Sequence, residues 1–103
     1  MNVITVEDLK SRLASESSDV FLLDIREDRE ITMNPMQNAG EIHHIAMGDV
    51  KEHLNDIPRD KTVVVICRSG ARSGMVVEYL LEQDYDNVAN LIGGVMAWEQ
   101  SNA

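Results

Sequence analysis

The only cysteine of the 103-residue chain, Cys67, directly follows a β-branched apolar run at residues 62–66. Such a run predicts a buried, central strand. In open α/β sheets, binding sites form outside the carboxyl ends of the strands, and Cys67 stands at such an end. A lone cysteine is most often a small buried hydrophobe. At this position, however, a thiolate could act as the nucleophile of covalent catalysis.

The turn that follows Cys67 offers several groups that would stabilise a negative charge on its sulfur. Gly70 permits backbone torsions that other residues resist, so the N–H groups of residues 68–73 can point inward as an anion-binding nest. The helix expected over residues 73–83 directs the positive end of its dipole at the same place. Arg68 and Arg72 add two positive charges. We therefore predict that Cys67 is the catalytic residue and that its thiol pKa lies below the ordinary value of about 8.5.

Two chemistries use a cysteine in this setting, sulfur transfer and phosphoryl transfer. Cysteine-dependent phosphatases have one more residue between cysteine and arginine than the four that separate Cys67 from Arg72. The shorter loop makes a smaller cradle, which suits one sulfur atom better than a tetrahedral phosphate. No aspartate is clearly placed as the general acid for a leaving alkoxide. Sulfur transfer is the favoured chemistry, and phosphoryl transfer is the alternative.

Strand-like and helix-like segments alternate along the chain, which predicts an α/β fold with a largely parallel sheet. The expected strands cover residues 3–4, 20–25, 62–66 and 88–91, with a further short strand within residues 42–47. Helices are expected after a capping Thr5, over residues 27–32, from Asp49 to just before Pro58, over residues 73–83, and after Gly93-Gly94. Residues 33–40 are expected to form a loop because they are rich in Asn, Pro and Gly.

The composition argues against several classes of partner and site. Eighteen acidic residues oppose nine basic ones, a formal charge of −9, and both nucleic acid and an anionic membrane surface require clustered Lys and Arg. A single cysteine excludes an internal disulfide. The adjacent His43 and His44 would point to opposite faces of a strand, so no metal is expected. Because no basic and apolar leader or membrane-length apolar run is present, we expect a cytoplasmic protein.

Three blocks of residues resemble the rhodanese family, and together they extend over nearly the whole chain. They are Leu23-Asp24-Ile25-Arg26, Cys67-Arg68-Ser69-Gly70-Ala71-Arg72 and Leu91-Ile92-Gly93-Gly94-Val95-Met96-Ala97-Trp98. The second block is similar to the active-site loop of the family and is strongly specific. Residues 39–45 depart from the family pattern, since a Gly-Glu-Ile sequence stands where the family usually has Gly-His-Ile. The pocket wall formed by this segment is therefore not predicted.

The resemblance implies that residues 1–103 form one rhodanese domain, a three-layer fold with a five-stranded, mainly parallel sheet flanked by helices. It implies that Cys67 carries a persulfide without the help of a cofactor. The residues expected to bind that persulfide and its donor are Arg68, Ser69, Gly70, Ala71 and Arg72, with the two arginines helping anionic donors to dock. Supporting roles fall to Asp24, Arg26 and Ser73. Asp24 would hold nearby loop backbone, and Arg26 would make an ion pair or contact substrate.

The expected reaction moves sulfane sulfur from thiosulfate or a persulfide, on a small molecule or a protein, to a thiol or cyanide acceptor. The chain has no second cysteine to resolve the persulfide, so the acceptor comes from outside. Rhodanese-like domains can also serve as binding or regulatory modules without turnover. The presence of Cys67 favours the enzyme over that alternative.

Overall fold

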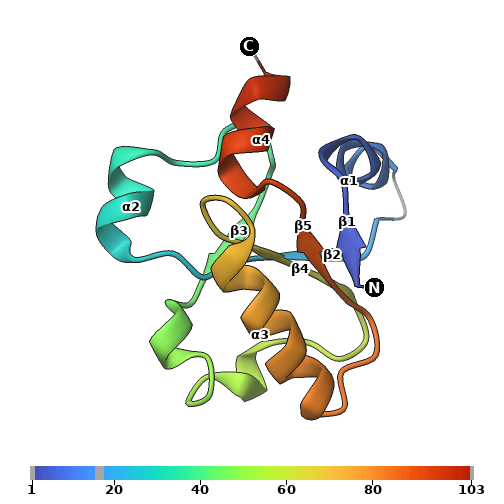
Figure 1. Cartoon of the computed structure of the whole chain (residues 1–103). Helices are drawn as coiled ribbons and strands as arrows, with labels where there is room; N and C mark the ends of the chain where they lie inside the picture. Colours follow the sequence, from blue (N-terminus) through green and yellow to red (C-terminus); the bar gives the residue numbers. More distant parts are fainter. Residues whose placement is uncertain (1, 16–17, 103) are drawn as a thin grey trace.

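A computed structural model describes residues 2–15 and 18–102 of the chain (Figure 1). Its five strands are β1 (Val3–Ile4), β2 (Val20–Asp24), β3 (Ile42–His44), β4 (Thr62–Ile66) and β5 (Val88–Leu91). They form one sheet in the order β1-β5-β4-β2-β3, and all four pairings are parallel. The predicted α/β fold with a five-stranded parallel sheet is confirmed.

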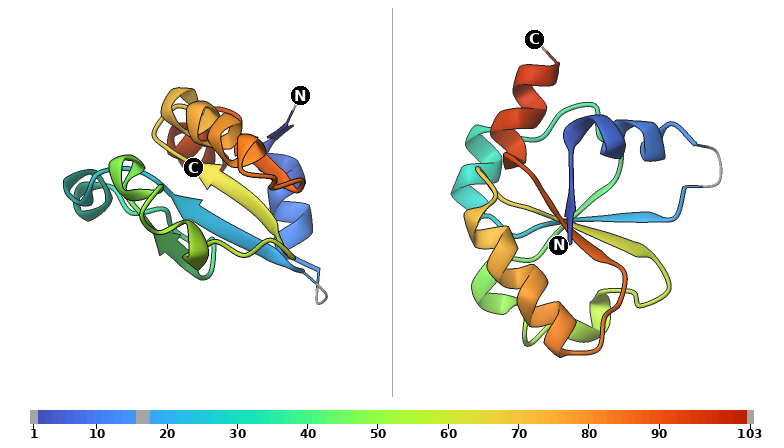
Figure 2. Two further views of the ribbon diagram at one scale, coloured as in Figure 1. Left: turned by 90° about the horizontal axis from the view of Figure 1, so that it is seen from below. Right: turned by 45° about the vertical axis from the view of Figure 1, so that its right-hand side comes forward.

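Helices cover both faces of this sheet, as Figure 2 shows for α1 and α3. The α-helices are α1 (Val6–Leu13), α2 (Asp28–Met33), α3 (Ala71–Glu82) and α4 (Gly94–Ser101), and two short 3-10 turns are η1 (Met47–Asp49) and η2 (Leu54–Asp56). The Thr5 hydroxyl accepts the Asp8 N–H at 3.1 Å and so caps α1, as its residue type predicts. Among the described residues, no helix combines the length and apolarity needed to cross a membrane.

The central strand β4 places Cys67 between two apolar layers. All five of its residues are buried, which is why residues 63–66 are continuously apolar rather than alternating. Val63 and Val65 pack in one core cluster with α3, whereas Val64 and Ile66 pack in the other with α1 and α4. A strand held on both faces and by β2 and β5 on either side fixes the position of the residue that follows it.

The prediction of a helix from Asp49 to just before Pro58 is wrong, because the segment folds into η1, a turn and η2. Its hydrogen bonds are mostly of the tighter i to i+3 kind, including Val50 N–H to Met47 O and Ile57 N–H to Leu54 O. Val50 and Ile57 are both buried, and their spacing of seven residues imitates a helical face. Burial of these two apolar side chains is enough to hold the segment against the core, and a single long helix is not required to bury them.

Several boundaries also differ from the expectation by one to three residues, and one of them concerns the loop after Cys67. The short strand expected within residues 42–47 is β3, and it occupies only the first three of these residues because the chain turns into η1 after it. Helix α3 begins at Ala71, two residues earlier than predicted, with Gly70 as its N-cap. Arg72 and Ser73 therefore belong to the first helical turn, and the loop itself is only residues 67–70.

Candidate active site

Cys67 lies at the carboxyl end of β4 and is 1% exposed. Gly70 has a φ of 105°, a left-handed conformation that favours glycine, and it turns the chain from the strand into α3. Helix α4 closes the loop from the other side, since the N–H groups of Val95 and Met96 donate to the carbonyls of Cys67 and Arg68 at 2.9 and 3.1 Å. A Cβ on Gly94 would overlap both carbonyls, which explains the second glycine of the Gly-Gly pair in the last block.

The sulfur of Cys67 sits in a cradle of hydrogen-bond donors. The Gly70 N–H lies 3.0 Å from Sγ and the Ser73 hydroxyl oxygen lies 3.2 Å from it. Burial raises the thiol pKa, but hydrogen bonds from Ser73, Gly70 and Ser69 outweigh it, so the pKa of Cys67 is lowered from its ordinary value. This direction agrees with the one expected from the sequence, and the shift itself stays a prediction. The groups responsible are a hydroxyl and backbone amides, and not chiefly the arginine charges.

This lowered pKa gives a direct prediction for the ionisation of the thiol. We expect the thiolate of the native protein to form with a midpoint below that of the urea-unfolded chain, whose thiol should have a pKa of about 8.5. Thiolate absorbance in the ultraviolet measures both midpoints, after subtraction of the same titration on Cys67→Ser. A native midpoint at or above the unfolded one would show that burial dominates over the donors.

Arg72 does not point a free charge at the sulfur. Its guanidinium makes a two-pronged ion pair with Glu30 of α2, with N–O distances of 2.7 and 2.8 Å. This hydrogen bonding lowers the pKa of Glu30 to about 2, so Glu30 is ionised at any pH at which the protein would work. The pair joins α2 to α3 beside the loop and balances the Arg72 charge. Sequence reasoning missed Glu30, because no local pattern links residues so far apart.

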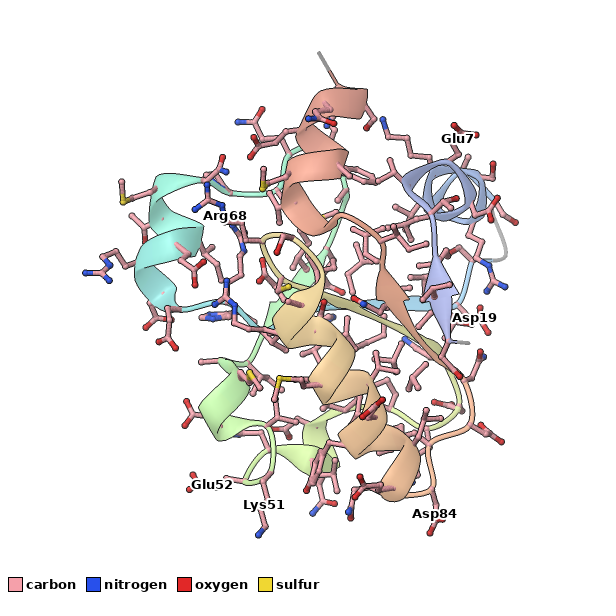
Figure 3. All side chains as sticks on the ribbon, in the orientation of Figure 1. Glu7, Asp19, Lys51, Glu52, Arg68 and Asp84 are labelled. Atoms are coloured by element: carbon pink, nitrogen blue, oxygen red, sulfur yellow. The ribbon has the colours of Figure 1, made fainter. Side chains whose placement is uncertain are left out.

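Arg68 is the loop arginine whose charge remains available. Its side chain is exposed and, within residues 2–15 and 18–102, makes no hydrogen bond or ion pair. Figure 3 shows it projecting from the loop on the side where α2 lies. Ser69 and Ala71 are exposed as well. The loop therefore presents exposed polar and small side chains above a buried sulfur.

Asp24 and Arg26 form a buried ion pair next to the loop rather than within it. Both side chains are 2% exposed, and the closest N–O distance is 2.8 Å. The Asp24 carboxylate also accepts the Arg26 backbone N–H at 3.1 Å, and Arg26 donates to the Asn34 carbonyl at 2.9 Å. Asp24 thus holds loop backbone as predicted, and Arg26 takes the ion-pair alternative. Together they fix the two ends of the segment that carries α2 and Glu30.

The segment that departs from the family pattern, residues 39–45, forms β3 and its approach. The His43 ring stacks on Phe21 with centroids 4.1 Å apart, and His44 Nε2 lies 2.7 Å from the Arg26 carbonyl. All three histidines line a cavity of about 960 Å³ beside β3, which does not include Cys67. In the part of the chain that the structure describes, no group of three His, Cys, Asp or Glu side chains is placed to hold a metal ion.

Asn90 is the other residue that sequence reasoning missed. It stands in β5, paired in register with Val65 of β4. Its amide nitrogen donates to the Gly70 carbonyl at 2.9 Å, and its oxygen accepts the Ser73 hydroxyl at 2.5 Å. A polar residue one position before the end of an otherwise apolar strand, adjacent to the strand of the cysteine, was the signal that could have revealed it.

The fold and the cradle around Sγ define an α/β protein with a cysteine-centred candidate site at the carboxyl end of the central strand of a parallel sheet. Residues 5–101 match the rhodanese-like domain family. A sulfurtransferase of Allochromatium vinosum is 41% identical over 95% of this chain and 88% of its own length, and a putative sulfurtransferase of Bacillus subtilis is 41% identical over 93% and 88%. The chain belongs to the rhodanese-like domain family.

The crystal structure of a rhodanese-like domain protein from Staphylococcus aureus has the same fold. It superposes with a TM-score of 0.81 at 35% identity, covering 95% of this chain and 91% of the other. The sequence resemblance to this family is thereby confirmed. The names of the relatives support a sulfurtransferase as the coarse class of this protein.

Proposed function

We propose that this protein transfers sulfane sulfur through a persulfide on Cys67. The observation that carries the proposal is the donor cradle at the end of β4, where Gly70 and Ser73 both face Sγ at hydrogen-bond distance. Such a cradle stabilises the thiolate, which is the nucleophilic form of cysteine. The sulfurtransferase relatives described above support the same reaction class.

The reaction runs in two balanced steps. Cys67 thiolate attacks the outer sulfur of the donor, a new S–S bond forms, and the donor leaves with the electron pair of its broken bond, as sulfite from thiosulfate or as a thiolate from a persulfide. An acceptor thiolate or cyanide then attacks the outer sulfur of the Cys67 persulfide, and Cys67 thiolate departs. This is covalent catalysis by thiol–disulfide-type exchange. No second cysteine is present, so the acceptor is a separate molecule, and a reducing cytoplasm would keep the thiol free.

Intact mass tests the proposal directly. After incubation with thiosulfate and removal of excess, wild-type protein should gain the mass of one sulfur atom, and cyanide should then remove it with formation of thiocyanate. Cys67→Ser protein treated alike should gain nothing. Absence of the added sulfur with both thiosulfate and a glutathione persulfide would favour a binding module without turnover. Cys67-dependent hydrolysis of a phosphotyrosine mimic would favour the phosphatase instead.

The Glu30–Arg72 ion pair predicts how the KM for an anionic donor depends on the charge near the sulfur. Because Glu30 balances Arg72, Glu30→Gln should free one positive charge near the sulfur and lower the KM for thiosulfate about three- to tenfold, as Coulomb's law gives for a dianion at roughly 8 Å in water. Glu7→Gln on α1, labelled far from the loop in Figure 3, makes the same change of charge and should leave KM nearly unchanged. Steady-state kinetics at one ionic strength measure both. An equal effect of the two substitutions would mean that only the net charge matters.

A further inference from the structure

The side chain of Asn90 joins the two residues that donate to the sulfur of Cys67. Gly70 gives its backbone N–H to Sγ at 3.0 Å and receives the Asn90 amide on its carbonyl at 2.9 Å. Ser73 has its hydroxyl oxygen 3.2 Å from Sγ and 2.5 Å from the Asn90 oxygen. Asn90 itself is half-buried. One carboxamide therefore makes a hydrogen bond to each of the two residues that donate to the sulfur.

The chemistry of the neighbours fixes which way this carboxamide faces. The Gly70 carbonyl can only accept, so the nitrogen of Asn90 must face it and the oxygen must face Ser73. The carboxamide oxygen also can only accept, so the hydrogen bond between them uses the hydroxyl proton of Ser73. That hydroxyl has a single proton. It has two neighbours that could receive it, the Asn90 oxygen and Cys67 Sγ.

The two protonation states of Cys67 place different demands on this proton. With a neutral thiol, S–H donates to the Ser73 oxygen, Ser73 O–H donates to Asn90, and Asn90 N–H donates to Gly70, so every donor has an acceptor. With a thiolate, the sulfur can only accept, and the Ser73 proton is drawn toward it. The Ser73 and Asn90 oxygens then face each other with no proton between them, which is unfavourable.

We propose that Asn90 is a positioning residue that holds the Ser73 proton away from Cys67 while the sulfur is neutral and gives it up when the sulfur becomes an anion. The proposal rests on the proposed function only in taking Cys67 as the reacting sulfur. Asn90 competes with the thiolate for one hydrogen bond and so limits how far the cradle favours ionisation. Because a more basic thiolate is intrinsically more nucleophilic, this competition preserves reactivity in the fraction that is ionised.

A double-mutant cycle on Asn90 and Ser73 tests the competition. The readout is the midpoint of thiolate formation followed by ultraviolet absorbance, each titration being corrected by one on the same variant carrying Cys67→Ser. Asn90→Ala should lower the midpoint by about half to one pH unit. This is about half of the free energy of one hydrogen bond to a charged group, because in wild type two acceptors compete for the Ser73 proton. Ser73→Ala should raise it. With Ser73→Ala already present, adding Asn90→Ala should shift it no further.

Two more variants separate this role from a merely structural one. Asn90→Asp keeps an acceptor facing Ser73 and adds negative charge, so it should move the midpoint up, opposite to Asn90→Ala. Asn87→Ala is the matched control, because Asn87 lies just before β5 and its amide donates to Thr62 at 2.9 Å, away from the loop. It should leave the midpoint unchanged. Asn90→Val, which suits a strand and carries no acceptor, replaces Asn90→Ala if the latter is unstable.

The double-mutant cycle has one result that supports the proposal and two that overturn it. A lower midpoint in Asn90→Ala that vanishes on the Ser73→Ala background supports the proposal. A raised midpoint in Asn90→Ala, or a shift that persists without the Ser73 hydroxyl, overturns it. The titration involves no sulfur donor and no turnover. Failure of the sulfurtransferase proposal would therefore appear in the mass experiment and leave this measurement intact.

Discussion

Cys67→Ser is expected to reduce sulfur transfer to the rate of the uncatalysed reaction while the protein stays folded. The reacting atom is lost, because an alcohol of ordinary pKa cannot attack a sulfane sulfur at neutral pH. The fold has little reason to change. Serine is close to cysteine in size, and its hydroxyl can accept the Gly70 N–H and donate its own proton to the Ser73 oxygen, as a neutral thiol would. The measurement is thiocyanate formation from thiosulfate and cyanide, with circular dichroism and thermal unfolding on the same samples.

A displaced thiol provides the control for this result. In the Cys67→Ser background, Ser11→Cys introduces one thiol on the exposed face of α1, outside the cradle. This variant has the same number of thiols as wild type but none at the end of β4, and it should remain inactive. Activity in the Cys67→Ser protein would remove the cysteine from the mechanism. Activity restored by the displaced thiol would show that the cradle contributes nothing.

The path from β4 through Cys67 into α3 could be predicted because its determinants are local. A run of five buried β-branched or apolar residues specifies the strand, and Gly70 specifies the turn. The order of elements along the chain then fixed the fold class, since strands joined through helices pair in parallel. The first turn of α3 was placed two residues too late because Ala71 and Arg72 carry no capping signal, whereas the actual cap depends on the torsions of Gly70.

The partners of the site residues could not be predicted, because they come from other strands and helices. Glu30 meets Arg72 across 42 residues of sequence, and Asn90 meets Ser73 across 17. Each contact depends on how α2 or β5 is placed beside the loop, and no spacing along the chain encodes that placement. The consequence is chemical: Arg72, read from the sequence as a free charge for the donor, is already paired. The prediction of a helix over residues 49–57 failed for the same reason. Two apolar side chains of this segment are buried by tertiary contacts, and 3-10 turns suffice to place them.

Removal of one partner of the Asp24–Arg26 pair is expected to give the largest loss of stability in the chain. Both charges are almost fully buried and the pair is held by three N–O contacts of 2.8 to 3.1 Å. Asp24→Asn leaves the Arg26 guanidinium buried without its counter-charge, and Arg26→Met does the same to the Asp24 carboxylate. Each should lower the free energy of unfolding by about 3–5 kcal/mol, the usual cost of an uncompensated buried charge.

The double variant Asp24→Asn/Arg26→Met distinguishes this explanation from simple loss of packing. With both charges gone, no buried charge is left uncompensated, so the double variant should be destabilised by clearly less than the sum of the single variants. Urea unfolding with an unchanged m-value measures all three. Asp56→Asn is the control, because Asp56 meets His53 at 3.2 Å on the surface, where both side chains are more than half exposed, and it should cost less than about 0.5 kcal/mol. If the losses of unfolding free energy in the double variant are additive, the pair stabilises the protein through packing and hydrogen bonds. The α2 segment would then not be held beside Cys67 by the pairing of two buried charges.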